Sequence, residues 1–318
     1  MSDGSKIEWT QATWSWVTGC TKISDGCLNC YIQGTPPFRI EHRKFSGPDI
    51  GATTGVKLHS DRLWWPRRWR KPRRVFVNSL GDTFHEDVPR DLIAEAFAVM
   101  AVCPQHTFQV LTKRHARMRA LLGDPEFAAD VRTLAWQMDG HAARRIPWPL
   151  PNVHLGVSAE NQKWLDIRYP ALLATPAAVR WISAEPLIGP LSFWPDDHAG
   201  HDSDLIGEFP FERSTCLDCS GFEDEDPRVP WTTQDHVIDA DWIVAGGESG
   251  PGARPCELEW LRLLRDQCAE TRTPFFCKQL GSLLGRQVGA GSKGGDWLAW
   301  PEDLRVREFP RTAEQVAA

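Results

Sequence analysis

The segment Val153-His-Leu-Gly-Val-Ser-Ala-Glu-Asn161 shows the pattern that decides the fold. Its first half is an apolar run and its second half is polar, and a helical pattern follows over residues 161–174. A second apolar run then occupies residues 179–182. Near-continuous apolar runs are typical of strands buried on both faces, as in parallel sheets, and a strand, a helix and a second strand form one βα unit. The segment therefore predicts a parallel sheet covered by helices.

The same pattern recurs on both sides of this segment. Further apolar runs, each followed by polar residues, lie at 14–18, 74–78, 107–111, 242–245 and 274–277. Helical patterns lie at about 90–102, 114–122 and 257–271. About seven such strands favour an α/β fold of the (β/α) barrel type, partial or complete, because consecutive βα units share one handedness. In barrels of this kind the functional site lies at the C-terminal ends of the strands.

Three cysteines stand close together near the N-terminus, in Cys20-Thr-Lys-Ile-Ser-Asp-Gly-Cys27-Leu-Asn-Cys30. Three thiolates can bind one metal centre and leave one position open for chemistry. The spacing alone leaves three interpretations open. The cysteines hold an iron–sulfur centre, they form a zinc site completed by a distant residue such as His42 or His59, or they are buried thiols without a ligand.

The bulk composition is that of a soluble globular protein. The chain has 318 residues, 42% of them hydrophobic, and a net charge of -6. It contains no apolar run of membrane-spanning length, and its N-terminus lacks the apolar core of a signal peptide. We therefore expect a cytoplasmic protein without a membrane partner. Nine cysteines in a reducing compartment favour metal binding over disulfides.

Polar residues follow every predicted strand and should converge on one mouth of the barrel. They are Asn78, Asp82, Lys113, Arg114, Ser158, Glu160, Glu185 and Glu248. For each of them the alternative is a helix cap or a solvated turn. Glu248 belongs to Gly246-Gly-Glu-Ser-Gly250, in which the glycines would let a ligand approach the backbone closely.

Residues 195–237 interrupt the strand pattern. They contain twelve Asp or Glu and only two Arg, which predicts an acidic insertion between two strands. The insertion also contains the residues of a four-ligand zinc set, namely His198, His201, Cys216 and Cys219. The other interpretation is that these four are solvated loop residues. The barrel would then comprise residues 1–194 and 238–284, and we assign no role to the tail 285–318.

The segment 62–74 contains seven Arg or Lys and three Trp. It could bind a nucleic-acid backbone while its aromatic rings stack on bases, and the candidate residues for this are Arg67, Arg68, Arg70 and Lys71. It could equally be an amphipathic segment whose Trp side chains seal the barrel while the arginines stay in water.

Several motifs in combination resemble a phage-associated family that has a radical-SAM-like three-cysteine motif. The resemblance covers most of residues 6–280. It is carried by Lys6-Ile-Glu-Trp-Thr-Gln-Ala-Thr-Trp14, the cysteine loop, Val77-Asn-Ser-Leu-Gly-Asp-Thr-Phe-His85, Leu111-Thr-Lys-Arg114, Leu155-Gly-Val-Ser-Ala-Glu-Asn161, Ile182-Ser-Ala-Glu-Pro-Leu187 and Gly246-Gly-Glu-Ser-Gly-Pro-Gly-Ala-Arg-Pro255.

The resemblance implies a radical-SAM-like barrel. It further implies a 4Fe-4S cluster on Cys20, Cys27 and Cys30, with S-adenosyl-L-methionine bound at the open iron and cleaved to a 5′-deoxyadenosyl radical. The usual spacing in radical SAM enzymes is Cys-x3-Cys-x2-Cys, whereas the first interval here is six residues. The Gly-Gly-Glu motif of that superfamily usually follows an early strand, whereas here it follows a late one, so Asn78 and Asp82, after the second strand, are the candidates for binding the methionine amino group. The other cofactor-binding candidates are Tyr31, Lys113, Ser158, Glu185 and Glu248.

The expected function is therefore that of a radical SAM-like enzyme that modifies a nucleic acid or a nucleotide and receives electrons from a donor. A second hypothesis is a non-catalytic metal-binding module that docks nucleic acid or a partner protein through the Trp-rich segment. A third is a nucleic-acid processing enzyme that uses Lys, Glu and Asp at the barrel mouth, with zinc as a structural element.

Overall fold

The computed structural model describes residues 2–5, 7–140, 146–194 and 238–310. The acidic insertion lies outside the described residues, and so do the zinc candidates His198, His201, Cys216 and Cys219.

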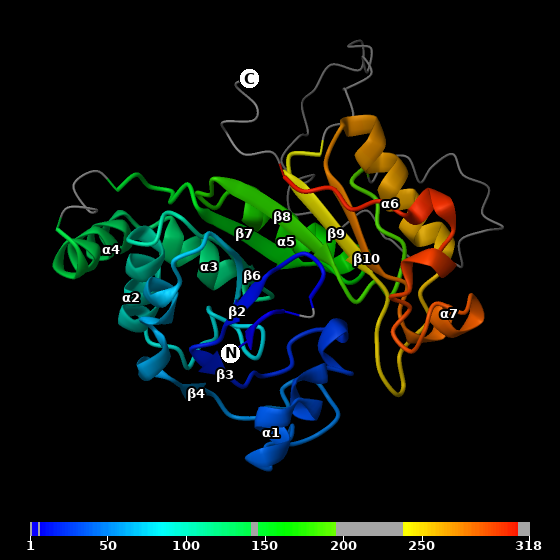
Figure 1. Cartoon of the computed structure of the whole chain (residues 1–318), viewed down its shortest axis with the longest axis horizontal. Helices are drawn as coiled ribbons and strands as arrows, with labels where there is room; N and C mark the ends of the chain where they lie inside the picture. Colours follow the sequence, from blue (N-terminus) through cyan, green and yellow to red (C-terminus); the bar gives the residue numbers. More distant parts are fainter. Residues whose placement is uncertain (1, 6, 141–145, 195–237, 311–318) are drawn as a thin grey trace, which may run out of the picture.

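One sheet of eight strands organises the chain (Figure 1). The strands, in spatial order, are β1 (Ser2–Asp3), β2 (Ala12–Trp14), β5 (Arg74–Val77), β6 (Thr107–Thr112), β7 (Val153–Ser158), β8 (Val179–Ala184), β9 (Trp242–Gly246) and β10 (Phe275–Gln279). Only β1 is antiparallel to its neighbour, and the seven strands from β2 to β10 are parallel. They follow one another in chain order, as the strands of a (β/α) barrel do.

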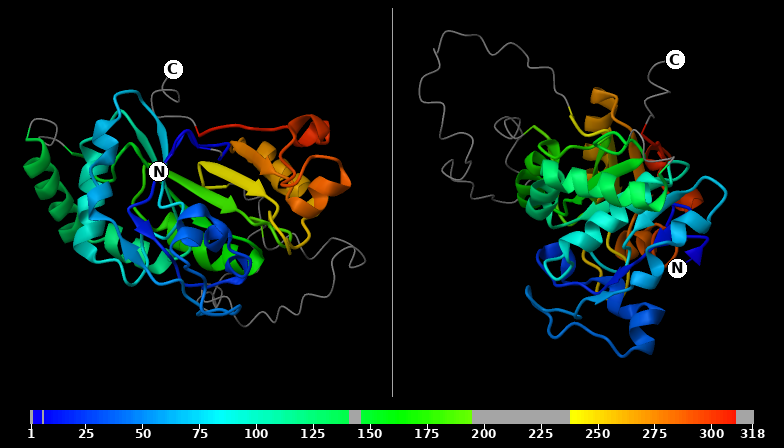
Figure 2. Two further views of the ribbon diagram at one scale, coloured as in Figure 1. Left: turned by 60° about the horizontal axis from the view of Figure 1, so that its bottom comes forward. Right: turned by 90° about the vertical axis from the view of Figure 1, so that its left-hand side faces the viewer.

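The sheet curls but does not close (Figures 1 and 2). Among the described residues, no pairing joins β10 to β1 or β2, so the sheet is an open half-barrel. The prediction of an α/β fold with a partial (β/α) barrel is thereby confirmed. Six of the seven parallel strands begin and end within two residues of the predicted apolar runs, whereas β2 overlaps the run 14–18 only at Trp14.

Helices cover the convex face of the sheet and enclose the main core. They are α2 (Arg90–Ala101), α3 (His115–Leu122), α4 (Pro125–Met138), α5 (Gln162–Leu173), α6 (Leu258–Thr271) and the short α7 (Ser282–Gln287). Val110, Leu155 and Ile182 of the sheet belong to the same buried cluster as Leu165 and Leu264 of the helices. The sequence analysis did not predict α4, although Pro125 at its first turn and the capping side chain of Asp124 mark its start.

Aromatic side chains fill the lower part of the concave face. Trp9, Trp181, Trp242, Phe76 and Phe276 form a second buried cluster there. Gly156 makes room for one of these rings, since a Cβ atom at this position would lie 2.4 Å from Trp181. Aromatic side chains therefore fill the concave face toward the N-terminal ends of the strands. A functional site has room only at the C-terminal ends, which we call the upper end.

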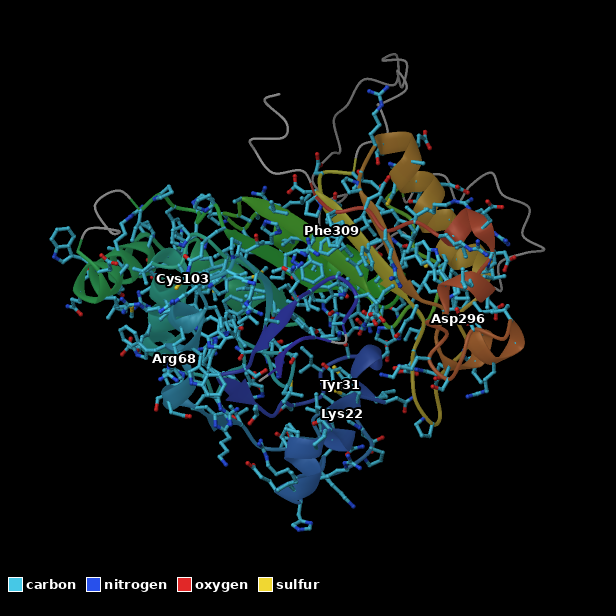
Figure 3. All side chains as sticks on the ribbon, in the orientation of Figure 1. Lys22, Tyr31, Arg68, Cys103, Asp296 and Phe309 are labelled. Atoms are coloured by element: carbon cyan, nitrogen blue, oxygen red, sulfur yellow. The ribbon has the colours of Figure 1, made fainter. Side chains whose placement is uncertain are left out.

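The C-terminal segment packs over this aromatic cluster. The ring of Phe309 stacks on Trp242 with a centroid distance of 5.7 Å, and the labelled side chain lies over the strands in Figure 3. Arg307 forms a bridge with Phe276 of β10. The described part of the tail thus has a packing role, which the sequence analysis did not assign.

A small subdomain follows β2 and carries the cysteine loop. Its strands β3 (Val17–Thr18) and β4 (Lys57–Leu58) pair antiparallel, and α1 (Pro36–Ile40) lies between them in the chain. Short 3-10 helices complete it, at Asp25–Cys27, Tyr31–Gly34, Ser60–Arg62 and Trp65–Arg68; two more, at Trp297–Ala299 and Glu302–Leu304, belong to the tail. No helix in the described ranges is long and apolar enough to span a membrane.

Candidate functional site

The cysteine loop lies against the C-terminal ends of the parallel strands. Gly19 pairs with Gly81, just beyond β5, and the hydroxyl of Tyr31 donates a hydrogen bond to the carbonyl of Ser79. Gly19 has a φ of +99°, and a Cβ atom there would lie 1.8 Å from the carbonyl oxygen of Gly55. Only glycine fits at the point where the chain turns into the loop.

The second half of the loop is a tight turn that brings two cysteines together. The amide of Cys27 donates to the carbonyl of Ser24 (2.8 Å), and the amide of Cys30 donates to the carbonyl of Cys27 (3.2 Å). Burial raises the pKa of the Cys20 thiol, and the charges of Cys27 and Cys30 add to this effect. That the three cysteines hold one metal centre stays a prediction.

Glu160, directly after β7, fastens the loop to the sheet. One carboxylate oxygen accepts from the amide of Gly26 (3.0 Å) and the other from Arg168 of α5 (2.8 Å), and both charged side chains are fully buried. Burial alone would raise the pKa of Glu160, but the charges of Lys113 and Arg168 outweigh it and hold the pKa below its usual value. Glu160 is thus an ionised anchor for the segment that connects Cys20 to Cys27.

Glu248 and Arg254 form a second clamp on the same loop. The carboxylate of Glu248 accepts from the side chains of Arg254 (2.6 Å) and Asn29 (3.0 Å). Arg254 also donates to the carbonyl oxygen of Asp25 (2.8 Å). Since Asn29 lies between Cys27 and Cys30, the contact of Glu248 with Asn29 fixes the turn that carries these two cysteines. Glu248 therefore holds the loop from β9, while Glu160 holds it from β7.

Arg114, at the end of β6, contacts the first cysteine directly. Its Nη1 lies 3.4 Å from the Sγ of Cys20 and 3.3 Å from a carboxylate oxygen of Asp82. Its Nε donates to Glu86 (2.8 Å) and its Nη2 to the carbonyl of Thr21 (3.2 Å). A guanidinium held by this many acceptors is rigid, so it presents one N–H group to the sulfur in a fixed direction.

The protonation state of the thiols reflects burial opposed by nearby cations. Burial raises the pKa of Cys20 to about 12, against the lowering effect of Arg114. Burial likewise raises the pKa of Cys30, while Lys113 and Lys22 act in the opposite direction. Without a metal both thiols are protonated at neutral pH. A metal ion would displace these protons, because thiolates are the ligands that metals bind.

Asn78 and Asp82, the candidates for the methionine amino group, have their hydrogen bonds inside the protein. The Oδ1 of Asn78 accepts from the amides of Trp16 and Val17, each at 3.0 Å. Asp82 accepts from Thr112 (2.7 Å) and from Arg114. In this structure both side chains stabilise the mouth, and their role toward a cofactor stays a prediction.

The remaining cofactor candidates surround the loop at the upper end of the concave face. Lys113 lies 3.9 Å from Glu160, and Glu185 pairs with Lys278 of β10 at 2.5 Å. The Glu185–Lys278 pair crosses over β9, whose last residue, Gly246, has no side chain to obstruct it. Ser158 is buried at the end of β7, next to Ser183 of β8. The ring of Tyr31 is 56% exposed, so its face is accessible from solvent (Figure 3).

Some residues that anchor the cysteine loop could not be identified from the sequence. Lys22 is buried and donates to the carbonyls of Leu28 and Pro48. Arg168 and Arg254 are distant in sequence from the loop segments that they anchor, so no local pattern connects them to it. Of the two histidines considered as zinc ligands, His59 is hydrogen-bonded to Thr18 (2.9 Å) and His42 is exposed.

The basic segment runs from Arg62, which donates to the carbonyl of Ser15 just after β2, to the opposite end of the strands. Trp69 contacts His106, which directly precedes β6, and the segment runs into the first residue of β5, Arg74. Figure 3 shows Arg68 in the part of the molecule that contains Cys103, apart from Tyr31 and Lys22. The structure does not bring Arg67, Arg68, Arg70 and Lys71 to the mouth.

Comparison with known proteins gives one family match. A search of curated proteins and a search of solved structures each found no match to this chain. The model of the family described as "Protein of unknown function (DUF5131)" matches residues 4–299. This match covers the cysteine loop and the seven parallel strands of the half-barrel, and the chain belongs to the DUF5131 family.

Proposed function

We propose that this protein is a radical SAM-like iron–sulfur enzyme whose cluster is held by Cys20, Cys27 and Cys30. The observation that carries the proposal is the way the loop is fastened. Side chains that follow β6, β7 and β9 hold it at the C-terminal end of a parallel half-barrel, the end at which such barrels carry out chemistry. Four clamping residues on one short loop would be excessive for a loop that has only to connect two strands.

The donor set suits a cluster better than a single ion. In the part of the chain that the structure describes, no three His, Cys, Asp or Glu side chains are arranged as ligands of one metal ion. In a cubane cluster each thiolate binds a different iron, so the three sulfurs need not converge on one point. Three soft thiolates with no fourth Cys or His in the loop also leave one iron open.

The chain's own residues would hold, orient and electrically balance the cluster. Arg114 would donate an N–H to the Cys20 sulfur, and Lys22 and Lys113 would offset the negative charge of the thiolates. When bound, such a cluster supplies the electron that cleaves S-adenosyl-L-methionine to a 5′-deoxyadenosyl radical. Lys113, Tyr31 and the Glu185–Lys278 pair lie around the loop and are the groups best placed to hold S-adenosyl-L-methionine or the substrate, which we expect to be a nucleic acid or a nucleotide.

The test is metal analysis and cofactor cleavage on the full chain. The protein is purified without oxygen, its iron, sulfide and zinc are counted, and it is then reduced with dithionite in the presence of S-adenosyl-L-methionine. The proposal predicts a brown protein with about four irons per cluster that releases 5′-deoxyadenosine. A colourless protein that holds zinc in the loop, or a cluster that never cleaves the cofactor, would instead favour a metal-binding docking module.

A further inference from the structure

The basic segment 62–74 has seven cationic residues and no acidic one, and the structure divides the seven into two groups. Three of them are used inside the fold. Arg62 donates to the carbonyl of Ser15, Arg73 lies over the ring of Trp69, and Arg74 lies over the ring of Phe309. The other four are exposed, and the contact of Arg67 with the ring of the exposed Trp64 lies at the surface.

Arg67, Arg68, Arg70 and Lys71 are all exposed. Within the described ranges none of the four forms an ion pair, whereas the half-buried Arg90 pairs with Asp130 and the half-buried Arg262 pairs with Asp303. Four like charges on adjacent residues repel one another, and a protein with an overall charge of -6 has acidic residues available to relieve this. Because no acidic side chain in the described ranges pairs with these four cations, they form a surface that is complementary to a polyanion.

The four cations stand on a rigid turn. Trp65 and Trp69 pack against the core, and Pro66 is buried between them. The carbonyl of Pro66 accepts from the amide of Trp69 (3.1 Å) and lies 3.1 Å from Nε2 of His106. Binding would therefore need little ordering of the backbone, which reduces its entropic cost.

Trp64 differs from the two tryptophans that anchor the turn. Its side chain is 38% exposed, and the guanidinium of Arg67 lies 5.2 Å from its ring centroid. Cations that follow a phosphate backbone, together with an aromatic face on which a base stacks, are the two components of sites for single-stranded nucleic acid. We infer that Trp64, Arg67, Arg68, Arg70 and Lys71, the Arg/Trp surface, bind single-stranded nucleic acid, with phosphates on the cations and a base on Trp64.

This surface is separate from the cysteine loop. Pro66 and Trp69 place its later part at the N-terminal ends of β5 and β6, and β6 has six residues, so this part is about 20 Å from the C-terminal ends of the strands. The nucleic acid would be held at one end of the half-barrel while the cysteines lie at the other. The inference goes beyond the proposed function and holds whether or not the loop binds a cluster.

The test measures binding of a fluorescently labelled single-stranded DNA 20-mer to the full chain by anisotropy, between 50 and 200 mM KCl. Four phosphate contacts predict a slope of about -2.8 for log affinity against log salt concentration, or a loss of about 50-fold over this range. Replacing Arg67, Arg68, Arg70 and Lys71 together by Ser should weaken binding at 50 mM at least about tenfold and bring the slope close to zero.

A matched control separates the surface from the overall charge. Arg39, Arg119, Arg286 and Lys293 are also exposed cations, and replacing these four by Ser changes the net charge equally. This variant should keep the slope of the unmodified protein. Trp64→Ala should weaken DNA binding about fivefold or more, while Trp64→Phe, which keeps a ring, should retain most of it.

Three results would overturn the inference. The first is no binding by the unmodified protein at 50 mM salt, and the second is an equal loss in the two quadruple variants. The third concerns heparin, a polyanion without bases. If heparin binds as tightly as DNA and Trp64→Ala leaves DNA binding unchanged, the surface is a general anion site and not a nucleic-acid site.

Discussion

At the scale of single residues, Glu160 shows how the site depends on a buried charge. Its carboxylate is fully buried, and it joins the loop amide of Gly26 to the guanidinium of Arg168. Neither charge has access to water, so each is tolerated only because of the other. Glu160 therefore connects the stability of the sheet to the position of the cysteines.

Glu160→Ala should lower the free energy of unfolding by about 3–5 kcal/mol, because it leaves the buried charge of Arg168 without a carboxylate partner. Glu86→Ala is the matched control. Glu86 also pairs with an arginine at the mouth, but its side chain is 60% exposed, so its loss should cost no more than about 1 kcal/mol. Urea denaturation followed by circular dichroism measures both values, and equal losses in the two variants would contradict the account.

The lowered pKa of Glu160 predicts that the protein loses stability in acid. The pKa of Glu160 is lowered in the folded protein, so its contribution to stability is complete above the pKa of an unfolded Glu, about 4.3. This contribution is lost as the pH falls through the lower folded value. Urea midpoints measured between pH 7 and pH 3 should therefore drop steeply only below about pH 4.3, and Glu160→Gln should flatten that drop. An unchanged profile in Glu160→Gln would assign the acid sensitivity to other groups.

The contact between Arg114 and the sulfur of Cys20 predicts an effect on the reduction potential of the proposed cluster. An N–H group and a positive charge at the Cys20 sulfur stabilise the reduced state, which raises the reduction potential. Arg114→Lys should lower the potential, and Arg114→Gln should lower it further, in an anaerobic spectroelectrochemical titration. Arg90→Gln, which removes a guanidinium from the outer helices, should leave the potential unchanged. A potential that is the same in all three variants would show that Arg114 has only a structural role.

For strands and helices, the sequence was informative where burial requires a run of apolar residues. Each parallel strand is buried on two faces, so it appears as a short apolar run, and the polar residues after it mark the functional edge. The helix α3 was predicted over 114–122, whereas no helix was predicted over the residues of α4, Pro125–Met138, although Asp124 caps its start. The packing of Phe309 on Trp242 was also missed, since no local pattern connects a C-terminal residue to a strand.

The candidate site was predictable only in part, because some of its contacts join residues that are distant in sequence. The three cysteines are close in sequence, so their spacing alone predicted a common metal centre, and this stays a prediction. Glu248 was identified as a polar strand end, but its partner Arg254 and its contact with Asn29 depend on tertiary structure. Asn78 illustrates the opposite case: it follows a strand as a ligand-binding residue would, yet it accepts hydrogen bonds from Trp16 and Val17.

At the scale of the whole molecule, the half-barrel accommodates an interruption between β8 and β9. These two strands are adjacent in the sheet although residues 195–237 separate them in the chain. The composition of that segment allows little burial of apolar surface. The sheet and the cysteine loop should therefore not depend on it.

Replacing residues 196–236 by a short Gly-Ser linker should leave a folded protein that still binds its cluster. Thermal unfolding and the visible absorption spectrum measure the two properties, with the full chain as the reference. Insoluble protein, or loss of the chromophore in a folded variant, would show that the insertion belongs to the core or to the metal site.

Iron counting in single variants shows whether Cys20, Cys27 and Cys30 hold the cluster. Cys103, Cys256 and Cys268 are buried thiols outside the loop, so they serve as matched controls. After anaerobic reconstitution, Cys20→Ala, Cys27→Ala and Cys30→Ala should each lose the iron, because two thiolates are too few to retain it. Cys103→Ala, Cys256→Ala and Cys268→Ala should each keep the iron content of the unmodified protein. Full iron content in any one of the three loop variants, or no iron in the unmodified protein, would contradict the account.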